Sequence, residues 1–324
     1  MLATYAVGID IGGTKMAAGL VERKGRMVAE ARRMAPKSGP FAIVDAVVDL
    51  TAQVTADVHP SEVAGIGIGL PGQVDFMRQS IEFATNLPLM GVDVRSLVMS
   101  RTKMPVTIDN DVHTAAQGER RFGVAAGARD WAMVTVGTGV GGALFVSGQP
   151  YRGHRGLAGE IGHMVVEFDG RPCPCGGIGH LEPYVARPAI AAAGRELAGT
   201  FAGAGVLERA GRDVSAVTAE DVIQCAREGD EACLSILHDA ARILGRALVG
   251  IVNFMNPELI VIGGGVAEGN QFFADEAARA IAEEALAGRA DVRVVLAQLG
   301  NDAGALGAAA LAFDEYDSRE SVHR

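Results

Sequence analysis

One local pattern occurs twice in this chain: an apolar strand, a turn of glycine and threonine, and a second apolar strand. The first turn is Gly8-Ile9-Asp10-Ile11-Gly12-Gly13-Thr14-Lys15, and the second is Gly137-Thr138-Gly139-Val140-Gly141-Gly142. Because glycine lacks a Cβ atom, such a backbone can approach a ligand closely and direct its N–H groups toward it. We therefore expect two loops that can clamp one nucleotide from opposite sides.

The first turn also carries polar side chains. Thr14 and Lys15 add a hydroxyl group and a cation beside Gly12 and Gly13. Asp10, at the end of the strand, can hold Mg²⁺ through water. The alternative is a plain hairpin in which glycine supplies a positive φ.

Near the middle of the chain, Asp109-Asn110-Asp111 lies between the apolar run 105–108 and a helical pattern. Polar groups at the end of a buried strand face the edge at which α/β folds bind ligands. Helix capping is the alternative, because Asp and Asn are preferred N-cap residues. The stretch is therefore a candidate for both roles.

Periodicity predicts the remaining elements. Strands are expected at residues 5–9, 16–21, 26–33, 63–69, 131–137, 143–146, 259–262 and 292–296. Helices are expected at residues 41–58, 93–103, 222–227, 230–255, 272–286 and 303–313, with a capping box at 218–221 and a frayed end at 315–324.

Three glycines, Gly263-Gly264-Gly265, follow one of these strands. A helix after this turn places its first N–H groups near an anion or a nucleotide, which makes Gly264 a candidate nucleotide contact. The alternative is ordinary glycine turn chemistry.

Two stretches, at 67–72 and 137–142, match the pattern G-x-G-x-x-G. The dinucleotide fingerprint needs a helix directly after its glycines. Strand-forming residues follow Gly142, and Gln-Val-Asp follows Gly72. The sequence therefore disfavours a dehydrogenase.

A second kind of site is indicated by Cys173, Cys175 and His180 in one glycine-rich loop, with His163 ten residues before the first cysteine. Two thiolates and two imidazoles complete a tetrahedral zinc site. The alternative is two buried cysteines and two surface histidines. Cys225 and Cys233 lie in helical patterns and are expected to be small core residues.

Length and charge limit the remaining possibilities. A chain of 324 residues exceeds one usual core, so two domains are expected. The net charge of −10 argues against nucleic-acid and anionic-membrane partners. The first residues lack the features of a signal peptide, and no run is long and apolar enough to span a membrane. With four cysteines and no secretory signal, the sequence favours a reducing cytoplasm.

Taken together, the motifs resemble those of the sugar kinases of the ROK family (repressor, open reading frame, kinase), close to its bacterial glucokinases. The resemblance runs from about Val7 to Ala312. It rests on the two glycine turns, on Asn110-Asp111, on Gly159-Glu160-Ile161-Gly162-His163, on the Cys-x-Cys-Gly loop that ends in Glu182, and on the glycine-rich stretches 263–265 and 300–304.

The resemblance implies the actin/hexokinase-like (ribonuclease H-like) fold, in which two α/β domains flank a cleft. It implies ATP and Mg²⁺ as cofactors, transfer of a phosphoryl group to the 6-hydroxyl of a hexose, and homodimers or homotetramers. The C-terminal helix returns to the N-terminal domain in this family, which assigns residues 1–112 plus 302–324 to one domain and 113–301 to the other.

Roles for individual residues follow from the same resemblance. Asp111 is the expected base, and Asp109 takes a structural role at the strand end. The expected sugar ligands are Asn110, Glu160, His163 and Glu182. The expected nucleotide contacts are Asp10, Gly12, Gly13, Thr14, Lys15, Thr138, Gly139 and Gly264.

One position departs from the family pattern. The family loop has three zinc-binding cysteines, and His180 stands at the third position here. Zinc accepts imidazole as well as thiolate, so we expect a structural zinc ion on His163, Cys173, Cys175 and His180.

Glucose is the expected hexose. Kinases for N-acetylmannosamine, N-acetylglucosamine, mannose or fructose are alternatives. An alternative of another class is a sugar-binding regulator, but a DNA-binding repressor is disfavoured because only about four residues precede the first strand.

Overall fold

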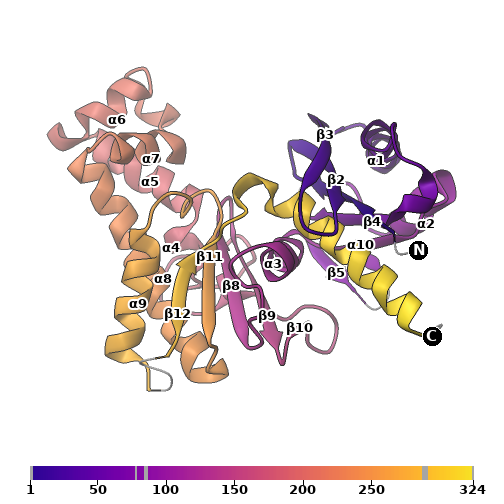
Figure 1. The fold of residues 1–324 in the computed structure, drawn as a ribbon. Coiled ribbons are helices and arrows are strands. Elements are labelled where there is room, and N and C mark those ends of the chain that lie inside the picture. The colour runs from indigo at the N-terminus through magenta and orange to yellow at the C-terminus, as the bar shows by residue number, and fades with distance from the viewer. Residues whose placement is uncertain (1–2, 77–78, 84–86, 287–290, 323–324) are drawn as a thin grey trace. The chain divides into compact units, whose positions relative to one another are not determined.

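The computed structural model describes residues 3–76, 79–83, 87–286 and 291–322. The chain divides into two compact units (Figure 1). Unit 1 comprises residues 1–127, 150–158 and 298–324, and unit 2 comprises residues 128–149 and 159–297. No helix within the described ranges has the length and apolar character needed to span a membrane.

Unit 1 is organised around a mixed sheet with the strand order β3-β2-β1-β4-β7. Short turns join β1 (Tyr5–Ile11), β2 (Lys15–Glu22) and β3 (Met27–Met34), which therefore pair antiparallel. Helices α1 (Pro40–Val54) and α2 (Val94–Thr102) precede β4 (Val63–Leu70) and β7 (Val106–Asn110), and these two strands run parallel to β1. The carboxyl ends of β1, β4 and β7 therefore lie at one edge.

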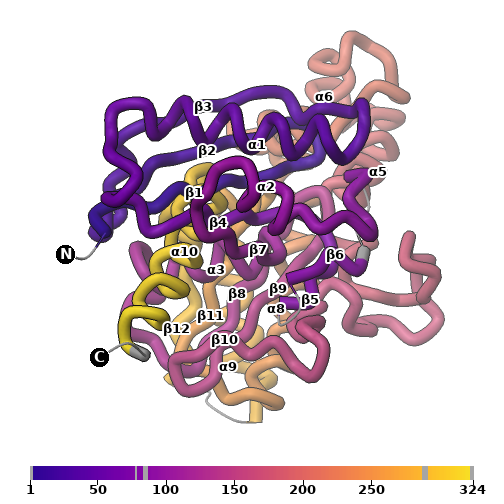
Figure 2. The backbone as a smooth tube through the Cα atoms, turned by 90° about the vertical axis from the view of Figure 1, so that its right-hand side faces the viewer, coloured from indigo at the N-terminus to yellow at the C-terminus, as the bar shows by residue number. Residues whose placement is uncertain are grey.

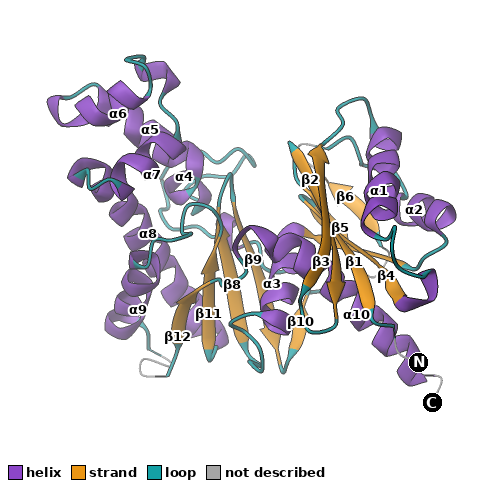
Figure 3. Cartoon of the chain, turned by 45° about the horizontal axis from the view of Figure 1, so that its top comes forward, coloured by secondary structure: helices purple, strands orange, loops and turns teal. Residues whose placement is uncertain are grey.

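Helix α10 (Ala303–Val322) lies directly on the backbone of this sheet, on the face opposite α1 and α2 (Figures 2 and 3). A Cβ atom at Gly8 of β1 would lie 1.8 Å from the carbonyl oxygen of Ala305, and one at Gly67 of β4 would lie 1.7 Å from that of Ala308. Glycine is therefore required at both positions, and the alanine-rich sequence of α10 permits the close approach.

The C-terminal helix is longer than the sequence predicts. The expectation of a frayed end at 315–324 is wrong for residues up to Val322, and residues 323–324 lie outside the described part of the chain. Asp314 pairs with Arg121 at 2.6 Å, and Asp317 pairs with Arg23 at 2.9 Å. These ion pairs tie the last turns to α3 (Asp111–Phe122) and to the β2–β3 turn.

Unit 2 contains the second five-stranded sheet, with the order β10-β9-β8-β11-β12. Its strands are β8 (Trp131–Val136), β9 (Val140–Val146), β10 (Gln149–Tyr151), β11 (Leu259–Gly263) and β12 (Arg293–Leu296). Apolar residues of β8 and β11 form one core with helices α4 (Glu182–Val185), α5 (Arg187–Ala198), α6 (Ala204–Arg209), α7 (Ala219–Arg227), α8 (Glu231–Met255) and α9 (Phe272–Glu284). The predicted capping box is confirmed: Thr218 and Asp221 each accept the other's backbone N–H.

Helix α9 (Phe272–Glu284) begins where the sequence predicts, and a turn separates it from the three glycines. The backbone after Gly263 forms a turn in which Gly264 O accepts the N–H groups of Ala267 and Glu268, and α9 begins only at Phe272. The first N–H groups of α9 therefore do not follow these glycines directly, and the alternative of glycine turn chemistry describes the stretch. Gly264 instead has φ +86° and lies against the backbone of Val136, where a Cβ atom would be 2.4 Å from its carbonyl oxygen.

The units differ from the expected division of the chain at three places, of which the shortest is residues 298–301, now in unit 1. Residues 113–127 lie in unit 1, because α3 packs closely on α10. A Cβ atom at Gly307 would be 1.8 Å from the carbonyl oxygen of Thr114. Residues 150–158 also return to unit 1 before the chain continues in unit 2.

Candidate active site

The polar residues predicted at strand ends share one edge of the unit 1 sheet. Register pairs Asp10 with Gly69, and Gly69 with Asp109. The carboxylate groups of β1 and β7 therefore lie at the same level, with a glycine between them on β4. Asn110 ends β7, and Asp111 begins α3.

Asn110 is the N-cap of α3. Its Oδ1 accepts the backbone N–H groups of Val112 at 2.9 Å and His113 at 3.2 Å, and its Nδ2 donates to the carbonyl oxygen of Gly72 at 2.8 Å. The capping alternative therefore describes Asn110 correctly. These bonds use one of the two amide hydrogens, and the capping geometry fixes the orientation of the side chain.

Asp111 has the electrostatic character of a general base. Burial raises the pKa of its carboxyl group to about 6, and the negative charge of Asp10 adds to this shift. Burial also raises the pKa of Asp10. A base is most effective when its pKa lies near the operating pH, so the environment of Asp111 suits proton transfer near neutrality.

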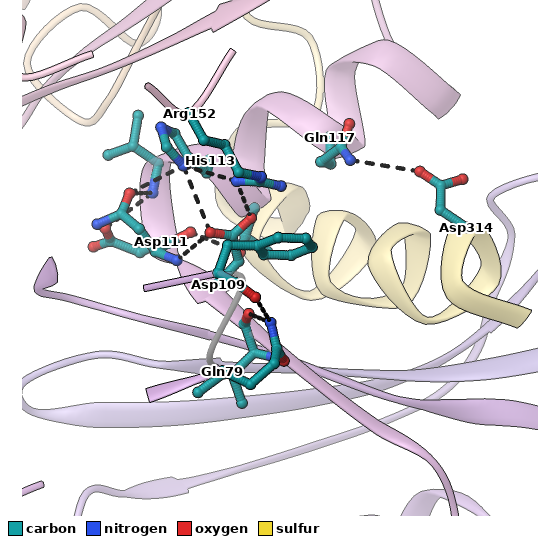
Figure 4. A network of polar contacts seen from close by, with 12 residues as sticks. Gln79, Asp109, Asp111, His113, Gln117, Arg152 and Asp314 are labelled. Atoms are coloured by element: carbon teal, nitrogen blue, oxygen red, sulfur yellow. Dashed lines mark hydrogen bonds and ion pairs between the residues drawn. The ribbon is translucent and has the colours of Figure 1, made fainter. Parts of the chain in front are cut away.

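The side chain of Asp109, unlike that of Asp111, pairs with an arginine (Figure 4). Its side chain is 1% exposed, and its Oδ2 pairs with Nη1 of Arg152 at 2.7 Å. Its Oδ1 accepts the backbone N–H of Asn110 at 2.9 Å and lies 3.5 Å from Nδ1 of His113. A buried carboxylate that pairs with a cation and a backbone N–H has contacts typical of a structural residue, which is the role expected for Asp109.

The first glycine turn is a tight hairpin between β1 and β2. The N–H of Gly12 donates to the carbonyl oxygen of Lys15 at 2.9 Å, and Gly13, Thr14 and Lys15 are exposed. Neither Gly12 nor Gly13 has a positive φ. A positive φ, which the hairpin alternative required, therefore does not explain the two glycines, although a Cβ atom at Gly12 would lie 3.0 Å from the carbonyl oxygen of Lys15.

The second glycine turn lies in unit 2, between β8 and β9. The carboxylate of Glu182 accepts the backbone N–H of Val140 at 2.9 Å. A Cβ atom at Gly139 would lie 2.5 Å from the same carboxylate oxygen. Gly264 contacts the end of β8, so Thr138, Gly139 and Gly264 meet at the carboxyl ends of β8 and β11.

The four residues predicted to bind zinc are brought together. The ligating atoms of His163, Cys173, Cys175 and His180 all lie within 4.8 Å of one another. The two sulfur atoms are 3.2 Å apart, Nδ1 of His180 is 3.2 Å from the sulfur of Cys175, and Nδ1 of His163 is 3.8 Å from the sulfur of Cys173. The donor set of two thiols and two imidazoles fits tetrahedral zinc.

His163 has two different neighbours. Its Nδ1 faces the thiols, and its Nε2 lies 4.0 Å from Oε2 of Glu160. The imidazole can therefore bind a metal with one nitrogen and face the expected sugar ligand Glu160 with the other. Burial raises the pKa of the Cys173 thiol, and a bound cation would favour its thiolate form.

Comparison with known proteins identifies the family. A family model described as ROK family matches residues 6–315. The chain belongs to the ROK family.

Two curated ROK relatives differ in their names. A glucokinase of Streptomyces coelicolor is 32% identical over 310 residues, covering 94% of this chain and 96% of that protein. A xylose repressor of Bacillus subtilis is 26% identical over 317 residues, covering 97% of this chain and 78% of the repressor.

A solved structure also matches almost the whole chain. It is that of a ROK family glucokinase from Streptomyces griseus in complex with glucose and AMPPNP. Its TM-score is 0.84 at 32% identity, with 96% of this chain and 99% of that chain covered. The resemblance to ROK glucokinases and the two-domain α/β fold class are both confirmed.

Sequence reasoning missed the residues that surround Asp109 and the end of β7. Arg152 and His113 surround Asp109, and Gln79 bonds the backbone of Ile108 through both ends of its amide. The one available signal was the basic, glycine-rich run Arg152-Gly153-His154-Arg155-Gly156 just before the Gly159–His163 motif.

Proposed function

We propose that this ROK protein is an ATP- and Mg²⁺-dependent kinase that phosphorylates a hexose at its 6-hydroxyl, with glucose as the preferred sugar. The observation that carries the proposal is Asp111, a carboxyl group with its pKa raised to about 6 at the strand edge it shares with Asp10. The glucokinases at 32% identity support the same reaction.

In this proposal Asp111 accepts the proton of the sugar 6-hydroxyl. The hydroxyl oxygen forms a bond to the γ-phosphorus, and the bond between that phosphorus and the β–γ bridging oxygen breaks, releasing ADP. A positioned base contributes about 10²–10⁴-fold to such a step. The remaining acceleration comes from alignment and charge neutralisation.

Four side chains are proposed to orient the sugar. Asn110 offers its remaining amide hydrogen beside Asp111, on a side chain already fixed by capping. Glu160, His163 and Glu182 belong to unit 2. Carboxylates suit this role because each has two acceptor oxygens and can accept from two vicinal hydroxyl groups.

The two glycine turns are proposed to bind ATP. Gly12, Gly13, Thr14 and Lys15 would present N–H groups, a hydroxyl and a cation to phosphate oxygens, and Thr138, Gly139 and Gly264 would supply the second surface. The absence of positive φ at Gly12 and Gly13 favours a role in ligand approach. Asp10 would hold Mg²⁺, which neutralises phosphate charge when it is bound.

Zinc is proposed as a structural ion on His163, Cys173, Cys175 and His180. Four protein ligands complete its tetrahedral coordination, so it would hold the loop before Glu182 in place and would not bind substrate.

The test is release of ADP from ATP and Mg²⁺ with glucose, mannose, fructose, N-acetylglucosamine and N-acetylmannosamine. Preference for glucose supports the full proposal. Preference for an N-acetylated sugar keeps the reaction and changes the substrate. No turnover with any sugar contradicts the kinase proposal, and sugar binding without turnover would favour a sugar-binding regulator.

A further inference from the structure

Residues 150–158 form a short excursion of the chain into unit 1, here called the strap. The strap leaves β10 and closes on itself through a bond from the N–H of Ala158 to the carbonyl oxygen of Arg152, at 3.1 Å. Gly156 lies against the backbone of β5 (Gln73–Asp75), where a Cβ atom would be 3.0 Å from the carbonyl oxygen of Val74. The strap thus contacts β5 through its backbone at Gly156, while Tyr151 and residues 153–155 are exposed.

Arg152 anchors the strap with a buried side chain. The side chain is 12% exposed and pairs at 2.7 Å with Asp109, which is 1% exposed. Its guanidinium lies over the ring of Phe76, 3.8 Å from the centroid. The planar guanidinium group can stack on an aromatic ring and donate to a carboxylate at the same time. The ammonium group of lysine is not planar and cannot form a bidentate pair.

The same side chain touches both elements that flank Asp111. On β7 it pairs with Asp109, whose Oδ1 accepts the N–H of Asn110 at 2.9 Å. On α3 its Nη1 lies 3.0 Å from Nδ1 of His113. Asp109 and His113 are also close to each other, with 3.5 Å between Oδ1 and Nδ1.

The preceding residue of β7 is held independently. The amide of Gln79 accepts the N–H of Ile108 at 2.8 Å and donates to its carbonyl oxygen at 3.2 Å (Figure 4). Two successive residues, Ile108 and Asp109, are therefore fixed by side chains from outside the strand. Asp111 lies just beyond them, and a displacement of about 1 Å can cost about 10²-fold in rate.

We propose that Arg152 is a positioning residue for catalysis, which holds the end of β7 and the first turn of α3 so that Asp111 is aligned for proton transfer. This role rests on the proposed function, in which Asp111 is the base. The side chain of Asn110 has bonds of its own to the backbone of Val112, His113 and Gly72, so we expect the loss of Arg152 to reduce kcat more than it raises KM for the sugar.

The test compares Arg152→Gln with Arg155→Gln in the intact protein. Arg155 lies in the same strap and is exposed, so its variant removes the same charge without breaking the buried pair. We expect Arg152→Gln to lower kcat about tenfold or more, with KM for glucose changed less than about threefold. Arg155→Gln should keep kcat within about twofold of the wild type.

Two further variants separate positioning from folding. Arg152→Lys keeps a cation beside Asp109 and should fold. It should still lower kcat several-fold, because lysine cannot stack on Phe76 and contact Asp109 and His113 at the same time. The double variant Asp109→Asn/Arg152→Gln removes both members of the ion pair, so no buried carboxylate is left without a cation. Its kcat should be at least about threefold higher than that of Arg152→Gln. A purely structural role would lower the unfolding midpoint without this pattern in kcat.

The proposal is overturned if Arg152→Gln or, should that variant not fold, Arg152→Lys has the same kcat as Arg155→Gln. A wild-type protein with no kinase activity, or an active Asp111→Asn variant, would instead contradict the proposed function. The two failures are therefore distinguishable.

Discussion

The carboxylate of Glu182 accepts a hydrogen bond from the backbone N–H of Val140, with 2.9 Å between Oε2 and nitrogen. This bond joins the segment after the cysteine loop to the second glycine turn. A proposed sugar ligand and a proposed nucleotide loop thus share one contact inside unit 2. A Glu182 variant that keeps the bond to Val140 should therefore differ from one that loses it.

Glu182→Gln should weaken sugar binding alone, because an amide oxygen can still accept the Val140 N–H. Loss of a charged acceptor is worth about 1.5–3 kcal/mol, so KM for glucose should rise about tenfold or more. Glu182→Ala loses both contacts, and KM for ATP should then rise as well. Steady-state kinetics in both substrates would check this, and equal KM values for ATP in the two variants would contradict it.

Removal of zinc should lower sugar affinity and stability together, because the metal organises the loop that precedes Glu182. Metal analysis should find one zinc per chain in the wild type and in His180→Cys, and little in Cys173→Ser. The unfolding temperature should follow the zinc content. Full activity in a purified protein that contains no zinc would show that the cluster is not a structural metal site.

Activity should depend on pH through Asp111. In the proposed mechanism the ionised carboxylate is the base. Because its pKa is raised to about 6, kcat/KM should be highest above that pH and should fall as the pH drops through it. In the free protein, Asp10→Asn removes a neighbouring negative charge and should lower the pKa of Asp111, which carboxyl-carbon NMR can follow. A profile that stays flat down to pH 5 would exclude Asp111 as a base with this pKa.

The C-terminal helix should contribute measurably to stability. Asp314 pairs with Arg120 and Arg121, and all three side chains are about a quarter exposed. Asp314→Asn should lower the free energy of unfolding by about 1–3 kcal/mol, because two partly buried cations lose their shared carboxylate and Arg121 keeps only its longer contact with Asp317, at 3.6 Å.

The matched control is Asp49→Asn, which breaks a more exposed pair with Arg33 and should cost no more than about 1 kcal/mol. Urea unfolding of both variants provides the comparison. Equal losses would mean that the Asp314 pairs do not hold the helix.

Local signals predicted much of this structure. Turn glycines and apolar runs placed β1, β2 and β3, and Thr218 with Asp221 marked the start of α7. The cysteine loop predicted the cluster with His163, because ligand type and spacing are visible in a sequence. These features depend on neighbouring residues, so periodicity and spacing can detect them.

Features that depend on distant residues were missed. The end of α10 looked frayed because its partners Arg23 and Arg121 lie far away in the chain. The same reason hid the pair of Asp109 and Arg152. At Gly264 the sequence left a turn and a nucleotide contact open, and the positive φ and the close contact with Val136 are those of a turn.

The most direct test of the central claim is the product formed from glucose, ATP and Mg²⁺ by the wild type and by Asp111→Asn, followed by ³¹P NMR. The account predicts glucose 6-phosphate from the wild type and a rate about 10²–10⁴-fold lower in the variant. Glucose affinity, measured by titration calorimetry, should be largely retained in that variant. Formation of the product by Asp111→Asn at the wild-type rate would contradict the assignment of Asp111 as the base.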